Sequence, residues 1–152
     1  MSIQKRLDDA QFLWKQKRYE GAFLSFLIAV AATSRRQFPR PIKDEQAFES
    51  FLKQGWFERI SVEYRGNVHP VYHLFYKWFR CELVHEGSLP IDIEFMPDSE
   101  SGTLSIRAGG APDYVLQISY GWFHELIHTV VTAPINRELF TNRLQNLSDN
   151  PS

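Results

Sequence analysis

The sequence predicts a mainly α-helical fold, an up-and-down helical bundle that carries a small antiparallel β insertion at about residues 89–119. Most of the chain outside this insertion has apolar residues every three to four positions, which is the spacing of one helix face. Within the insertion, apolar and polar residues alternate, as they do in half-buried strands. Twelve Phe, six Tyr and four Trp in 152 residues favour a folded core over a disordered chain.

We expect the first two helices at residues 3–17 and at about 19–37. The second is apolar over most of its circumference, and its alanines alternate with larger side chains. Small residues allow neighbouring backbones to approach closely, which favours the centre of a bundle. Pro39 and Pro41 end this helix, because proline cannot continue the helical hydrogen bonds. A third helix is predicted at residues 43–54.

The middle of the chain is expected to contain one short strand and one long helix. Residues 60–64 alternate apolar and polar side chains, and residues 65–67 have the composition of a turn. Pro70 suits the first turn of a helix, which we expect to end at Gly87.

The rest of the chain predicts a small sheet followed by helices. Period-two alternation indicates strands at residues 91–95, 104–107 and 114–118, with turn-forming residues between them. Helices are expected at residues 120–132 and 137–147.

Residues 1–147 are expected to form one domain, followed by a polar tail at residues 148–152. The net charge of −1 gives no global attraction to nucleic acid, so RNA binding would require a local patch. One cysteine, Cys81, excludes an internal disulfide and fits a cytoplasmic location. The most apolar run, residues 21–32, would span only about 18 Å as a helix, so we expect no membrane partner.

The string HELIH at residues 124–128 matches the HExxH pattern of zinc hydrolases. On a helix, His124 and His128 share a face and could bind one zinc ion, while Glu125 could activate its water. A catalytic zinc site also needs a third protein ligand. No histidine follows His128, and Glu138 matches no spacing typical of zinc proteases.

The polar face of an amphipathic helix explains the same string, because apolar residues fill the opposite side of this helix. His69 and His73 repeat the spacing of the two histidines, with no carboxylate between them. We therefore expect no metal or other cofactor. A zinc hydrolase that uses His124, Glu125 and His128 remains an alternative.

A second pattern places Arg80 five residues before His85 on the helix predicted to begin at Pro70. An arginine five residues before a histidine is common by chance, so the interpretation depends on the residues around the pair. Residues 72–87 resemble the Arg-x4–6-His element of the HEPN superfamily, which comprises all-helical nucleotide-associated and ribonuclease domains. The helix at about 19–37 resembles the second half of the N-terminal helical hairpin of these domains. The β insertion is similar to insertions in some bacterial members.

The resemblance implies a metal-independent endoribonuclease, or an RNA- or nucleotide-binding relative. Arg80 would bind the scissile phosphate through its planar guanidinium, and His85 would act as general base or acid. The ribose 2′-OH would be the nucleophile. On an ideal helix the two residues lie about 140° apart, so they converge only if the helix kinks near Val84 or if two subunits combine their residues. HEPN ribonucleases usually build the site across a dimer, which implies a homodimer.

Departures from the family pattern favour a second class of function, a non-catalytic dimerisation or interaction module with a cognate protein partner. Cys81 follows the arginine where active members commonly have a polar residue, and Glu86, next to His85, would repel RNA phosphate.

Independently of the motif, a local basic cluster could contact the phosphates of a nucleic acid, although such clusters are often only the solvated end of a helix. The cluster consists of Arg35, Arg36, Arg40 and Lys43.

Overall fold

The computed structural model describes residues 2–54, 56–98, 106–108 and 115–140. It is mainly α-helical with two small sheets, which confirms the predicted class at this level. Short 3-10 turns lie at Trp56–Arg59 and Pro134–Asn136. The α-helices are α1 (Ile3–Lys15), α2 (Tyr19–Gln37), α3 (Asp44–Lys53), α4 (Val71–Leu74), α5 (Glu82–Glu86) and α6 (Gly121–Val131).

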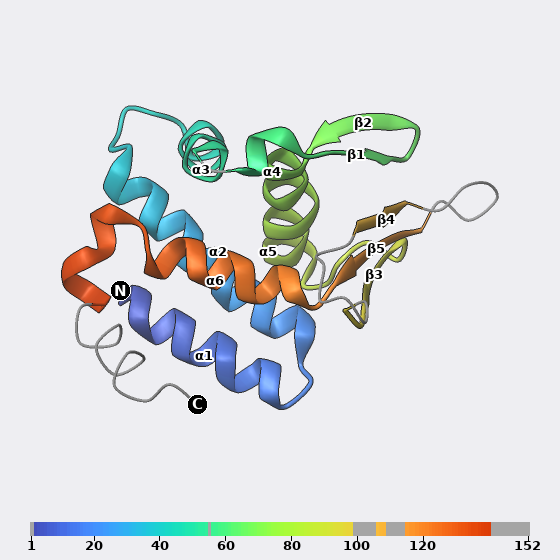
Figure 1. Cartoon of the computed structure of the whole chain (residues 1–152), viewed down its shortest axis with the longest axis horizontal. Coiled ribbons are helices and arrows are strands. Elements are labelled where there is room, and N and C mark those ends of the chain that lie inside the picture. Colours follow the sequence, from blue (N-terminus) through green and yellow to red (C-terminus); the bar gives the residue numbers. More distant parts are fainter. Residues whose placement is uncertain (1, 55, 99–105, 109–114, 141–152) are drawn as a thin grey trace.

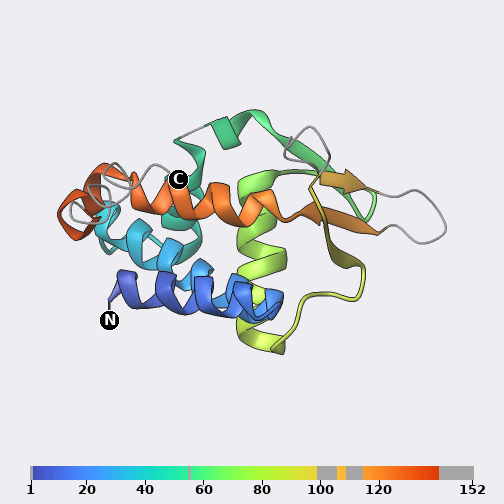
Figure 2. The same cartoon turned by 60° about the horizontal axis from the view of Figure 1, so that its bottom comes forward.

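Helices α1, α2 and α6 lie side by side, and the α4–α5 helix crosses them (Figures 1 and 2). Helix α2 is buried around most of its circumference, as its alanine-rich sequence predicts. Trp14 of α1 stacks on Phe123 of α6, with ring centroids 4.1 Å apart and planes 3° from parallel. The aromatic side chains therefore join the first and last described α-helices in one core.

Residues 71–86 form one continuous helix, as predicted, but its central part, Phe75–Cys81, is a π-helix. In a π-helix each amide bonds to the carbonyl five residues earlier instead of four, and such segments are frequent at functional sites. Phe75 and Phe79 of this segment are fully buried against the core. Gly87 ends α5 in the left-handed conformation, with φ of 76°.

Strand β1 (Ser61–Tyr64) pairs antiparallel with β2 (Asn67–Pro70). The tight turn between them requires positive φ at two successive residues, 52° at Arg65 and 80° at Gly66. The sequence pattern predicts the first strand and the turn but not β2, because β2 contains Pro70 and proline normally weakens a strand. Here Pro70 is the last residue of β2 and directly precedes α4. Its missing N–H group therefore interrupts no backbone hydrogen bonds farther along the strand.

The predicted β insertion is present, but its sheet is mixed, not purely antiparallel. Strand β3 (Ile93–Met96) pairs in parallel with β5 (Leu116–Ser119), and β4 (Ile106–Ala108) pairs antiparallel with β5 on its other side. Strand β5 leads almost directly into α6, so β5 occupies the centre of the sheet and the first strand of the insertion becomes an edge.

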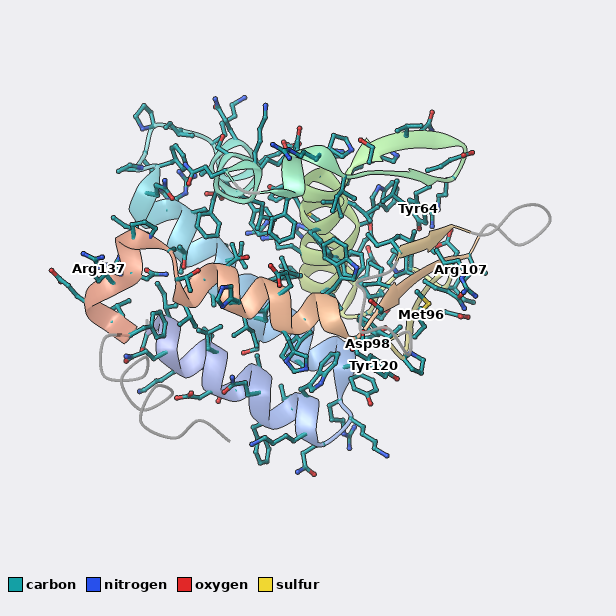
Figure 3. The ribbon with its side chains drawn as sticks, viewed as in Figure 1. Tyr64, Met96, Asp98, Arg107, Tyr120 and Arg137 are labelled. Atoms are coloured by element: carbon teal, nitrogen blue, oxygen red, sulfur yellow. The ribbon has the colours of Figure 1, made fainter. Side chains whose placement is uncertain are left out.

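Asp92 joins the β1–β2 hairpin to the segment before β3. The hydroxyl of Tyr64 donates a hydrogen bond to Asp92 at 2.6 Å, and Arg65 contacts both carboxylate oxygens at 2.8 and 3.0 Å. Figure 3 shows Tyr64 between the hairpin and the second sheet. Beyond β3, Asp98 accepts a hydrogen bond from the backbone amide of Gly121 at 2.6 Å, which satisfies a free amide at the start of α6.

Two further expectations concern the membrane and the C-terminal helix. No helix in the described ranges has both the length and the apolar character needed to cross a bilayer. Residues 137–140 are helical, at the start of the helix predicted at 137–147, and the remainder of that prediction and the polar tail lie outside the described residues.

Candidate functional site

Arg80 lies at a pocket of about 260 Å³ between α2, α3 and the π-helical segment. The floor of the pocket is apolar, and two arginines and one aspartate contribute its charged groups. One positive charge is therefore in excess within the pocket, although the whole chain is weakly acidic. The lining residues are Ile28, Ala31, Ala32, Ser34, Arg35, Asp44, Phe48, Tyr76, Arg80 and Val84.

The two arginines of the pocket have different partners. Arg35 donates to Asp44 through Nε at 2.7 Å and also to the backbone carbonyl of Ile42, so its guanidinium holds the loop between α2 and α3. The same hydrogen bond from Arg35 lowers the pKa of Asp44, with smaller Coulombic contributions from Arg35 itself and Arg80. Asp44 is thus ionised and already paired with Arg35.

Arg80, by contrast, has no acidic partner within 4.0 Å among the residues that the structure describes. Its guanidinium carbon lies 5.5 Å from the centroid of the Tyr76 ring, a cation–π contact within the π-helical segment. The guanidinium has five N–H donors, and its contact with the aromatic ring supplies no anion to accept hydrogen bonds from them. Arg80 is therefore available to bind an anion from outside the protein.

Tyr76 lies beside Arg80 and borders the same pocket. Partial burial raises the pKa of its hydroxyl, and the neighbouring thiol of Cys81 raises it further. The phenol therefore stays neutral and cannot offset the charge of Arg80. Its half-buried ring lies under the Arg80 guanidinium and packs against Phe48, with ring centroids 5.3 Å apart.

His85 is exposed in the last turn of α5 and does not line the pocket that contains Arg80. Val84 does line it, because residues four apart lie close together on a helix. His85 follows Val84 by one position, which turns its side chain about 100° farther around the axis. Within one chain, therefore, the two residues of the motif do not share a pocket.

The four residues of the predicted basic cluster have different surroundings. Arg36 donates a hydrogen bond to the side-chain oxygen of the buried Asn136 at 3.2 Å, whereas Arg35 faces Asp44. Arg40 and Lys43 are exposed in the connection between α2 and α3. Only Arg35 of this cluster reaches the pocket that contains Arg80.

The HExxH residues lie on the polar face of α6. His124 and His128 are exposed, and the ring of His124 packs edge-on against Trp14 with centroids 5.8 Å apart. Glu125 and His128 border a shallow depression of about 390 Å³ against α3. In the described parts of the chain, no third metal-binding side chain converges with the two histidines.

A different set of metal-binding side chains does converge. Glu45 and Glu49 of α3 meet His73 of α4, and one donor atom from each lies within 4.8 Å of the other two. The histidine spacing in the sequence points to His73 but not to the two glutamates, since they come from a helix that is distant from it in the chain. The available signal was their spacing of four residues, which places both on one face of α3.

Comparison with protein-family models, curated proteins and solved structures gives no match to this chain. The functional assignment therefore rests on the residues and their geometry.

Proposed function

We propose that the protein is a HEPN-like RNA-binding domain in which Arg80 binds a phosphate of the RNA. The observation that carries this proposal is that Arg80 lines a pocket and has no acidic partner within 4.0 Å among the described residues. A planar guanidinium can donate two parallel hydrogen bonds to a phosphate. The apolar pocket floor and the Tyr76 ring beside it fit a base or ribose next to that phosphate, since aromatic rings are common stacking surfaces for single-stranded RNA.

Binding of a fluorescently labelled single-stranded RNA, measured by anisotropy, tests the proposal. We expect Arg80→Ala to weaken binding about tenfold or more, because a hydrogen bond to a charged group contributes roughly 1.5–3 kcal/mol. Arg80→Lys is expected to restore only part of the affinity, since an ammonium group does not reproduce the bidentate geometry.

Lys77→Ala is the matched control, because Lys77 is an exposed cation on the same helix that does not line the pocket. Equal losses of affinity in Arg80→Ala and Lys77→Ala would contradict the proposal and indicate attraction by general charge. Unchanged binding in Arg80→Ala would also contradict it.

Cleavage of the bound RNA is a second candidate function, and the exposure of His85 favours it. The side chain of His85 has no hydrogen bond or ion pair within the described residues, so its imidazole is open to a second copy of the chain. In a homodimer, His85 of one subunit would act as general base toward the 2′-OH of an RNA whose phosphate is held by Arg80 of the other. The reaction would transfer the 2′-OH proton to His85 as the 2′-oxygen attacks phosphorus and the bond from phosphorus to the 5′-oxygen breaks. The leaving 5′-oxygen would take a proton from water, and the products would be a 2′,3′-cyclic phosphate and a 5′-hydroxyl.

Complementation between variants tests this arrangement. Arg80→Ala and His85→Ala are each expected to abolish cleavage in the presence of a chelator, and their mixture after subunit exchange is expected to recover part of it. Recovery follows because a mixed dimer contains one site with both residues. Cleavage that persists in both variants would exclude Arg80 and His85 as the catalytic pair, and a mixture that stays inactive while mixed dimers form would exclude the shared site. Absence of cleavage by the unchanged protein would favour a non-catalytic module.

A further inference from the structure

We propose that Glu45, Glu49 and His73 form a binding site for a divalent transition-metal ion, with zinc as the ion that their donor atoms fit. This site is separate from the proposed RNA site and does not depend on it. Asp44 and Phe48 of α3 border the Arg80 pocket, whereas Glu45 and Glu49 are directed toward His73.

The three side chains already converge. Nδ1 of His73 lies 2.5 Å from Oε1 of Glu49 and 3.9 Å from Oε1 of Glu45. His73 and Glu49 are about one quarter exposed, at 26% and 23%, while Glu45 is open to solvent at 55%. The site is therefore held against the protein on one side and accessible to an ion on the other.

An ion pair between His73 and Glu49 accounts for only part of this geometry. Glu45, whose Oε1 lies 3.9 Å from the same Nδ1 at the limit of ion-pair distance, remains one helical turn from Glu49, and like charges at this spacing destabilise a helix. A cation shared by both carboxylates removes that repulsion. It also places the imidazole as a third ligand at the position where its ring nitrogen already faces the two oxygens.

The donor set indicates the class of ion. Magnesium and calcium prefer sites made entirely of oxygen, and an imidazole ligand favours zinc or a similar transition metal. Zinc is bound by histidine nitrogen and glutamate oxygen, and three protein ligands leave its fourth position open for water. The ring of His69 lies against that of His73, with centroids 5.7 Å apart and planes 24° from parallel, which restricts rotation of the ligand ring.

Zinc binding by tag-free, full-length protein tests the proposal, with calorimetry for affinity and metal analysis after dialysis for stoichiometry. We expect one zinc ion per chain and a higher Tm when zinc is present. Glu45→Gln and His73→Gln are each expected to weaken zinc binding at least tenfold, since even changes to residues around metal ligands commonly cost about 10- to 100-fold. Glu45→Gln keeps the test valid if His73→Gln fails to fold, because the Glu45 side chain is mostly exposed.

Glu63→Gln and His128→Gln are matched controls on exposed positions away from the cluster, and both are expected to bind zinc as the unchanged protein does. Cobalt provides a further readout, because its visible absorption bands report the geometry of the bound ion, which His73→Gln should change by removing one ligand. Zinc binding that survives Glu45→Gln and His73→Gln but disappears in His128→Gln would overturn the proposal and favour HExxH. Absence of zinc binding to the unchanged protein at micromolar concentrations would also overturn it.

Discussion

Asp92 receives hydrogen bonds from two adjacent side chains of the β1–β2 hairpin, Tyr64 and Arg65. The hydrogen bond from Arg65 is the main reason that the pKa of Asp92 is lowered, and the bond from Tyr64 adds to it. Burial is the main reason that the pKa of the Tyr64 hydroxyl is raised, and its hydrogen bond to Asp92 raises the pKa further. This phenol therefore stays protonated at neutral pH. One carboxylate thus fixes the position of the hairpin relative to the segment before β3.

The lowered pKa of Asp92 predicts loss of stability in acid. Because the folded-state pKa lies below the unfolded value, the stabilisation is present above the unfolded pKa and is lost as pH falls through the folded one. Asp92→Asn is expected to lower the free energy of unfolding by about 1–3 kcal/mol at neutral pH and to flatten its decline below about pH 4. Denaturant titrations across this pH range measure both effects.

Asp9→Asn is the matched control for this prediction. Asp9 pairs with Arg6 at 2.8 Å on the surface of α1, where its side chain is 53% exposed. An exposed pair contributes about 0–1 kcal/mol, so this variant should differ little from the unchanged protein. Equal effects of the two substitutions would show that the contacts of Asp92 with Tyr64 and Arg65 do not stabilise the fold more than an exposed ion pair does.

At the scale of elements, replacing two glycines by alanine is expected to change the free energy of unfolding in opposite directions. Gly87 ends α5 at a φ of 76°, and a Cβ there would meet no atom but would force a strained backbone. Gly87→Ala should therefore lower the free energy of unfolding by about 1–2 kcal/mol. Gly21 lies within α2, and its Cβ would make an ordinary contact with Leu13 at 3.5 Å, so Gly21→Ala should raise stability by about 0.4–1 kcal/mol. Thermal unfolding of both variants measures the difference, and changes of the same sign would contradict it.

The helices could be predicted because their signals are local. Apolar periodicity, prolines at boundaries and a terminal glycine identify α2, α3 and the helix at residues 71–86. The π-helical segment within that helix could not be predicted from periodicity, because it depends on which carbonyl each amide finds after packing. Strand β2 and the parallel pairing of β3 with β5 likewise depend on contacts that no short sequence window contains.

The candidate sites show the same limit at the level of individual side chains. The sequence identified Arg80, but it could not indicate that Asp44 pairs with Arg35 and that Arg80 has no acidic partner within 4.0 Å in the part of the chain that the structure describes. It also placed Arg80 and His85 on one helix, where their angular separation argued against a shared pocket, and the structure leaves His85 outside the Arg80 pocket. Convergence of Glu45 with His73 is tertiary, since α3 and α4 meet only through folding.

At the scale of the whole molecule, the positively charged pocket and the two small sheets lie in different parts of the fold. The chain has a net charge of −1, yet the pocket between α2, α3 and the π-helical segment contains an excess cation. The two small sheets lie together beyond the crossing helix, at the end of the molecule away from Arg137 (Figures 1 and 3). The candidate RNA-binding residues are therefore carried by the helical part of the fold, and the sheets contribute none of the pocket lining.

Helix α3 borders both proposed sites, with Asp44 and Phe48 at the pocket and with Glu45 and Glu49 at the cluster around His73. Two ligands that bind one short helix from different sides are subject to thermodynamic linkage. If zinc changes the affinity for RNA by some factor, RNA must change the affinity for zinc by that same factor. The zinc concentration would then change how much RNA is bound, and bound RNA would change how much zinc is bound. Both effects would pass through α3, a helix of 10 residues.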